Sequence, residues 1–141
     1  MRVDISYIKD ILDRVLDQNK ADFNLNLIKE FWPDGDDEKR EKLVFHMEIM
    51  QDQGLIERSI EGEGIGFRKS FCGSNYTYDI SLVPLRLTAA GHDFAAALNK
   101  PGVIDSLMNT FKDAGPGETV KAVFKISGNI LDNQLKKLTG E

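Results

Sequence analysis

Residues 46–57 read HMEIMQDQGLIE, and this stretch decides how the chain is organised. Leu43, Met47 and Met50 recur at helical spacing on one side of the segment that leads to the glycine. Gly54 follows the helical pattern at the place where a left-handed backbone commonly ends a helix. Residues 55–60 then have the composition of a strand. The stretch therefore predicts a helix that runs to Gln53 and turns directly into a strand.

Two elements are predicted upstream of this helix. Apolar residues recur at helical spacing over residues 5–16, and either Asp4 or Ser6 is suited to cap the start of that helix. Residues 23–32 admit either a short strand or the beginning of a second helix, and Pro33 ends both alternatives. The acids at 36–38 then favour the start of the third helix, because negative charge is stabilised at a helix N-terminus.

A hairpin is predicted downstream of the third helix. Residues 61–75 contain four glycines and no helical period, which indicates a hairpin loop or wing. Residues 76–82 alternate as a strand, whereas the apolar residues of 83–87 follow the opposite parity. A shift of register is therefore expected near Pro84, at a bulge or an edge.

Three further helices are predicted in the rest of the chain. Thr88 is suited to cap a helix that runs through Ala97, and Gly91 in its first turn permits close packing. A short helix is expected over residues 103–111, and a long final helix over residues 120–138. Residues 114–117, AGPG, break the chain between these last two helices, and we interpret residues 115–119, GPGET, as a hinge between them.

The predicted order of elements is that of a winged helix-turn-helix. We expect a mostly helical α+β fold, with a small β-hairpin wing and a C-terminal helical extension. The winged-helix domain would occupy residues 1–100, and the extension, residues 101–141, would pack on it or serve association. Residues 46–57 and 85–94, with the tail at 98–111, resemble a family of uncharacterised bacterial and prophage winged-helix proteins, a domain of unknown function. This resemblance implies a fold and carries no catalytic residues.

The composition limits the classes of partner. The net charge is −5, and residues 1–60 carry 14 acidic side chains against 9 basic ones, while the rest of the chain is balanced. This distribution disfavours a protein coated in positive potential for nucleic acid. No apolar run approaches the ~20 residues of a membrane span, and the first residues lack the apolar stretch of a signal peptide. We expect a cytoplasmic protein that does not associate with membranes.

No motif predicts an enzyme, a cofactor or a metal site. Residues 62–66, GEGIG, superficially resemble a phosphate-binding loop, but no helix and no Lys-Ser/Thr pair follow them. Cys72, His46 and His92 do not have the spacing of metal ligands, and the single cysteine is expected to be an unreactive loop thiol. We expect His46 and His92 to lie in helices that pack into the fold, with His92 bonded to a neighbouring backbone group or carboxylate.

Two groups of basic residues are candidates for contact with double-stranded DNA. Arg68 and Lys69 are the only adjacent basic pair on the predicted wing, and wings of this kind reach phosphates or the minor groove. The alternative is a solvated loop whose aromatic residues fold back on the domain. Lys39, Arg40 and Lys42 lie early in the third helix and form the second group.

Two apolar surfaces are candidates for protein interfaces. Phe45 and Ile49 lie opposite the core side of the third helix, among acidic residues, where a groove-reading helix would present hydrogen-bond donors. We expect the C-terminal helices or a second subunit to cover them. The final helix carries a long apolar stripe that we interpret as an association element, made by Val120, Phe124, Leu131, Leu135 and Leu138.

Two hypotheses of function follow, neither of them enzymatic. The first is a DNA-binding regulator, which we place slightly ahead because winged helices so often bind DNA, although a fold does not imply a function. The second is a module for protein interaction or dimerisation that does not bind DNA. In both hypotheses we expect a homo-oligomer, most simply a dimer.

Overall fold

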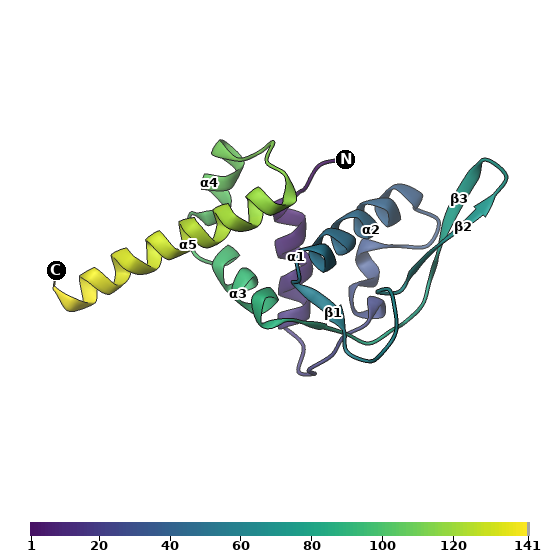
Figure 1. The fold of residues 1–141 in the computed structure, drawn as a ribbon, viewed down its shortest axis with the longest axis horizontal. Coiled ribbons are helices and arrows are strands. Elements are labelled where there is room, and N and C mark those ends of the chain that lie inside the picture. The colour runs from purple at the N-terminus through teal and green to yellow at the C-terminus, as the bar shows by residue number, and fades with distance from the viewer. Residues whose placement is uncertain (141) are drawn as a thin grey trace.

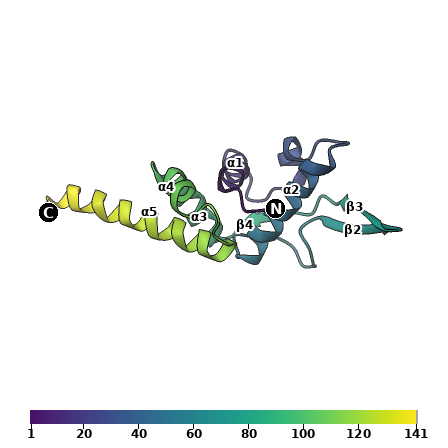
Figure 2. The ribbon, with the colours of Figure 1, turned by 90° about the horizontal axis from the view of Figure 1, so that it is seen from above.

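The computed structural model describes residues 1–140, which form ten helices and strands (Figure 1). In chain order they are α1 (Ile5–Leu16), the 3₁₀ helix η1 (Leu25–Phe31), α2 (Asp37–Asp52), β1 (Ile56–Arg58), β2 (Phe67–Cys72), β3 (Asn75–Ile80), β4 (Leu85–Leu87), α3 (Ala89–Leu98), α4 (Val103–Thr110) and α5 (Pro116–Thr139). The fold is thus mostly helical α+β, as the sequence predicts. The β2–β3 hairpin projects at one end of the molecule and α5 at the other (Figures 1 and 2).

The strands form two small antiparallel units. β1 pairs with β4, where Arg58 lies opposite Leu85. Leu85 also bridges Phe23, and the two backbones exchange hydrogen bonds of 2.8 and 2.7 Å. β4 therefore lies between β1 and the extended residue Phe23. The segment over residues 23–32 thus contains both alternatives that its sequence admits, one extended residue followed by η1. β2 and β3 form a separate hairpin.

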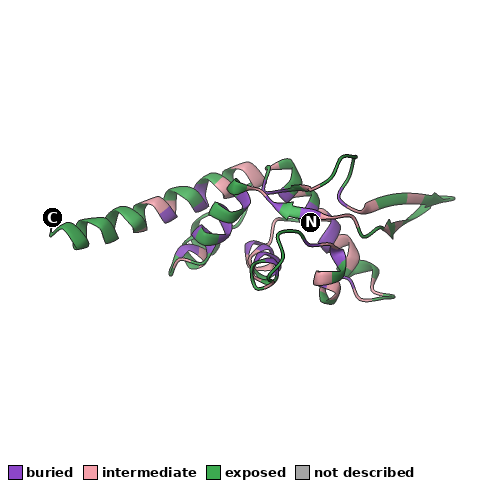
Figure 3. Cartoon of the chain, turned by 90° about the horizontal axis from the view of Figure 1, so that it is seen from below, coloured by how far each residue is buried: buried purple, intermediate pink, exposed green. Residues whose placement is uncertain are grey.

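One apolar core joins α1, α2, α3 and the β1–β4 pair (Figure 3). α2 contributes Leu43, Met47 and Met50, all completely buried, which confirms the predicted inner side of this helix. Gly91 of α3 is required by the packing, because a Cβ atom there would lie 2.0 Å from the carbonyl oxygen of Leu55. The predicted close approach at this glycine is therefore confirmed.

Three helices begin at side chains that accept a backbone N–H. Asp4 Oδ1 accepts from Tyr7 at 3.1 Å, and Thr88 Oγ1 accepts from Gly91 at 3.0 Å, at the starts of α1 and α3. At the start of α2, Asp36 Oδ1 accepts from Lys39. Such caps satisfy amide groups that have no partner inside the helix. Asp4, and not the alternative Ser6, is the cap of α1.

The structure corrects the sequence predictions in three places. β1 is shorter than the strand expected over residues 55–60. The hairpin loop or wing predicted over residues 61–75 contains a strand that the sequence did not place, because residues 67–72 form β2 and the flanking glycines hide its alternation. α5 begins at Pro116, so residues 116–119 belong to the helix and are not a hinge. Proline fits the first turn because its missing N–H would have no intrahelical partner there.

α5 is divided between a packed half and a projecting half. Ala122, Val123 and Ser127 are buried, and the first two belong to the core that α1–α3 form, together with Val103 and Leu107 of α4. Every residue from 131 to 140 is exposed (Figure 3). The extension thus packs on the domain with α4 and half of α5, and the other half of α5 continues past it.

Among residues 1–140, none of the helices has the length and apolar character that crossing a membrane requires.

Candidate interaction surface

The outward side of α2 combines carboxylates with apolar side chains. Glu41, Phe45, Glu48, Ile49 and Asp52 are spaced to share one side of the helix. Glu48 and Asp52 are exposed, while Phe45 and Ile49 are half-buried. This side of α2 therefore offers negative charge and apolar area, and Lys42, which borders it, is paired with Asp4.

Phe45 and Ile49 border a hollow of about 470 Å³. Val3 lines it from the segment before α1, and residues 113–116 line it from the connection between α4 and α5. Arg2 and Asp113, at its edge, form an exposed ion pair of 2.6 Å. The C-terminal region thus lies opposite Phe45 and Ile49, as predicted, but covers them only in part.

The β2–β3 hairpin has one aromatic and one polar face. Phe67, Lys69 and Phe71 alternate onto the same face as Tyr76 and Tyr78 across the strand pair. The Lys69 ammonium lies 4.1 Å from the centre of the Tyr76 ring and 5.7 Å from that of Tyr78. Phe71 is 74% exposed. The charge of Lys69 is therefore held against the aromatic rings.

Arg68 alternates onto the polar face of the hairpin. Its cross-strand neighbour is Asp79, which also accepts a 2.6 Å hydrogen bond from the Ser70 hydroxyl. Arg68 is exposed, but a carboxylate stands opposite it. The pair Arg68 and Lys69 thus lies on the projecting wing, as predicted, with the two charges on opposite faces.

The hairpin and α2 contact each other through polar groups. Arg40 Nη1 donates to the carbonyl oxygen of Tyr78 at 3.1 Å. A hydrogen bond to the Glu41 carboxylate, together with its negative charge, raises the pKa of Tyr76. Partial burial raises the pKa of Tyr78, and the charges of Glu41 and Glu48 add to this effect. The hairpin therefore adjoins the start of α2 at Arg40, and Glu41 is close enough to raise the pKa of both tyrosines.

The basic residues at the start of α2 point to different neighbours. Lys39 is exposed, with its ammonium 4.0 Å from Asp36. Arg40 lies over the Trp32 ring in addition to its contact with Tyr78. Lys42 forms a 3.1 Å ion pair with Asp4 and lies over the Tyr7 ring. Structural contacts thus engage Arg40 and Lys42, while Lys39 is exposed.

The predicted stripe on α5 is exposed along most of its length. Val120 is half-buried against the core, and Phe124 contacts Phe94 of α3 with ring centres 5.9 Å apart. The exposed fractions are 36% for Phe124, 44% for Leu131, 49% for Leu135 and 83% for Leu138.

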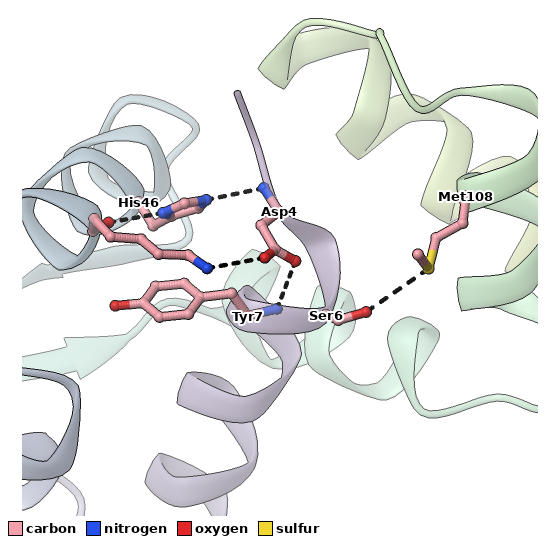
Figure 4. A network of polar contacts seen from close by, with 6 residues as sticks. Asp4, Ser6, Tyr7, His46 and Met108 are labelled. Carbon is pink, nitrogen blue, oxygen red and sulfur yellow. Dashed lines mark hydrogen bonds and ion pairs between the residues drawn. The ribbon is translucent and has the colours of Figure 1, made fainter. Parts of the chain in front are cut away.

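His46 is a completely buried residue whose role sequence reasoning missed (Figure 4). Its Nε2 accepts a 2.9 Å hydrogen bond from the backbone N–H of Asp4, and its Nδ1 lies 2.7 Å from the carbonyl oxygen of Lys42. The ring is therefore neutral, with its proton on Nδ1. Burial lowers the pKa of His46. Both histidines lie in helices that pack into the fold, as expected, with the side chain of His46 buried and that of His92 exposed.

Residues 1–140 contain no group of three or more His, Cys, Asp or Glu side chains arranged to hold a metal ion, and Cys72 is exposed at the hairpin tip. Comparison with known protein families, with curated proteins and with solved structures finds no match to this chain. The resemblance to the prophage winged-helix family therefore stays a prediction.

Proposed function

We propose that this protein is a winged-helix module that binds another protein through α2 and the β2–β3 hairpin. It acts without catalysis. The order of elements supports the winged-helix assignment, because α1, the extended residue Phe23, η1, α2, β1, the hairpin and β4 follow in sequence, and β4 lies between Phe23 and β1. In this assignment α2 is the recognition helix and β2–β3 is the wing.

The observation that carries the proposal is the hydrogen bond from Arg40 Nη1 on α2 to the carbonyl oxygen of Tyr78, which holds the hairpin beside the start of α2, next to Glu41. A winged helix that reads DNA brings these two elements to the duplex, where phosphates and base edges demand positive charge and donors. Here α2 presents Glu41, Glu48 and Asp52, and the hairpin presents aromatic rings, of which Tyr78 is close enough to Glu41 and Glu48 for their charges to raise its pKa. Such a surface repels a phosphate backbone and suits a protein partner.

The chemistry of the surface defines the partner. Carboxylates on α2 attract Lys and Arg side chains, and the aromatic rings of Phe71 and Tyr76 add cation–π and apolar contacts. Phe45 and Ile49 add apolar area beside the acids. The partner is therefore a basic protein segment whose Lys or Arg residues alternate with aromatic or aliphatic ones. Association between copies of the chain, which the sequence also predicts, would use α5 and leave this surface free.

Selection from a displayed peptide library tests the proposal. Peptides recovered by the full chain should carry basic residues next to apolar ones, and calorimetry should show binding weakened at least tenfold when Glu41→Lys and Glu48→Lys are combined, because two attractions become repulsions. The combination of Asp10→Lys and Asp17→Lys makes the same change of charge on α1 and should leave the affinity unchanged. Recovered peptides without basic residues, or equal losses in both variants, would contradict the proposal.

DNA binding is the second candidate, and the exposure of Arg68 and Lys69 on a projecting hairpin favours it. Those two side chains would have to supply most phosphate contacts, because Arg40 and Lys42 are engaged within the domain. The protein would then act as a regulator that approaches the duplex with its wing, while the carboxylates of α2 are turned away from the backbone.

A further inference from the structure

α5 carries a second apolar stripe that differs from its packed side. Phe124, Gly128, Leu131, Leu135 and Leu138 follow one another in steps of four, three, four and three residues. This is the spacing of the core positions in a coiled coil, where side chains of one helix insert between those of another. The stripe lies about a quarter of a turn around the helix from Val123, which faces the domain.

The packed side of α5 ends where the domain ends. Val123, Ser127 and Ile130 lie on that side, and its continuation is Gln134 and Lys137, both polar and exposed. The stripe instead stays apolar to Leu138, beyond the last contact with the domain. The apolar residues of the projecting half are therefore not explained by packing within this chain.

Gly128 favours an antiparallel partner over a parallel one. In a parallel pair of identical helices, Gly128 would face Gly128 of the second copy and leave a gap in the stripe. In an antiparallel pair centred between residues 129 and 130, Leu131 of each copy lies over Gly128 of the other. The same arrangement places Leu135 against Phe124 and Leu138 along the aliphatic stem of Lys121.

The charges beside the stripe agree with the same arrangement. Lys125 and Asp132 each follow a stripe residue by one position, so they flank the apolar seam. In the antiparallel pair, Lys125 of each copy lies opposite Asp132 of the other, which gives two ion pairs by symmetry. In a parallel pair, the residues that flank the seam, Lys125 and Asp132, do not face each other. Polar residues such as Ser127 and Gln134 lie on the other side of the seam instead, so no opposite charges meet.

We infer that the chain dimerises through α5, which pairs with α5 of a second copy in antiparallel orientation over residues 121–138. The two domains then lie at opposite ends of the helix pair, and each α2–hairpin surface remains free. This inference concerns α5 alone, so it and the proposed function can fail independently.

The mass of the full chain in solution tests the dimer. Light scattering after size exclusion should give about twice the chain mass of 15.8 kDa at micromolar concentration and above. Combining Leu131→Asp with Leu135→Asp should return a single-chain mass, because it places carboxylates in the seam. Both positions are exposed in the single chain, so the domain should keep its fold, which circular dichroism verifies. Asn129→Asp with Asn133→Asp adds the same charge away from the stripe and should leave the dimer intact.

Spin labels distinguish the two orientations. Cys72→Ser removes the exposed native thiol, so that a spin label can be attached at Thr139→Cys alone. In the antiparallel pair, the labels of the two copies should lie about 28 Å apart, given the 1.5 Å rise per residue of a helix. A parallel pair would bring the labels to about 10 Å, the spacing of packed helices. Lys125→Asp should weaken the dimer about tenfold, and adding Asp132→Lys should restore it.

The inference would be overturned if the unchanged protein has a single-chain mass at about 100 µM. This concentration is roughly the highest dissociation constant expected of a weak but specific dimer. A dimer that survives Leu131→Asp with Leu135→Asp would overturn it as well, because its interface would lie elsewhere. A label distance of about 10 Å would overturn the antiparallel arrangement.

Discussion

The imidazole of His46 accepts a hydrogen bond from the backbone N–H of Asp4 at 2.9 Å, and so joins α2 to the residue that caps α1 (Figure 4). The Asp4 side chain in turn accepts from Tyr7 and pairs with Lys42, which is one turn before His46 on α2. Burial raises the pKa of Asp4, but these hydrogen bonds and the charge of Lys42 outweigh it and leave the pKa lowered. The network ties the start of α1 to the middle of α2.

Replacement of His46 should destabilise the domain strongly. His46→Ala leaves the N–H of Asp4 without its acceptor and opens a cavity in a completely buried position. We expect a loss of about 2–4 kcal/mol in the free energy of unfolding. His92→Ala removes an exposed histidine and should change it by less than about 0.5 kcal/mol. Urea denaturation measures both, and similar values for the two variants would show that His46 is not a structural acceptor.

The same contact predicts a loss of stability in mild acid. Burial holds the pKa of His46 below its ordinary value of 6.5 in the folded chain, so the unfolded chain binds the proton more readily. Stability is therefore complete above pH 6.5 and falls as the pH drops below it, until the folded pKa is passed. Urea denaturation between pH 7.5 and 5 should show this fall, and His46→Gln should flatten it. The carboxylates with lowered pKa values, such as Asp13, contribute only at lower pH.

Gly91 should tolerate no side chain. Gly91→Ala would place a methyl group 2.0 Å from the carbonyl oxygen of Leu55, which belongs to the backbone and cannot turn away. We expect a loss of about 2–3 kcal/mol. Gly117→Ala also lies in a first helical turn but meets open space, and a helical alanine should gain about 0.5 kcal/mol. Thermal unfolding of the two variants should therefore shift in opposite directions.

Local signals account for most of what the sequence predicts correctly. The cap at Thr88, the stop at Gly54 and the apolar spacing of α2 each involve residues close in the chain, so their patterns are readable. Contacts between residues far apart in the chain leave no such local pattern in the sequence. The Asp4–His46 bond spans 42 residues, and no neighbouring residue indicates that a histidine of α2 will accept a hydrogen bond from the cap residue of another helix.

The candidate surface was predictable in composition but not in arrangement. The acids around Phe45 and Ile49 are visible in the sequence as a feature unsuited to reading DNA. The pairing of Lys69 with aromatic rings, and the hydrogen bond from Arg40 to Tyr78, depend on the register of the hairpin and on its position against α2. The register and the position of the hairpin both depend on β2, a strand that the flanking glycines hide in the sequence.

Duplex DNA provides the sharpest discrimination between the two candidate functions. Electrostatic binding is strongest at low ionic strength, where screening is weakest, so fluorescence anisotropy with unrelated duplexes at about 20 mM salt is the most permissive condition. We expect no change in anisotropy, because the α2–hairpin surface presents Glu41 and Glu48.

Binding, if observed, should weaken for all DNA sequences when Arg68→Ala and Lys69→Ala are combined. The slope of log affinity against log salt should shrink by about one for each phosphate that the variant no longer reaches. Glu38→Gln with Glu41→Gln should then strengthen binding only if α2 approaches the duplex. Salt-dependent binding with both of these responses would establish DNA as the partner in place of a basic protein segment.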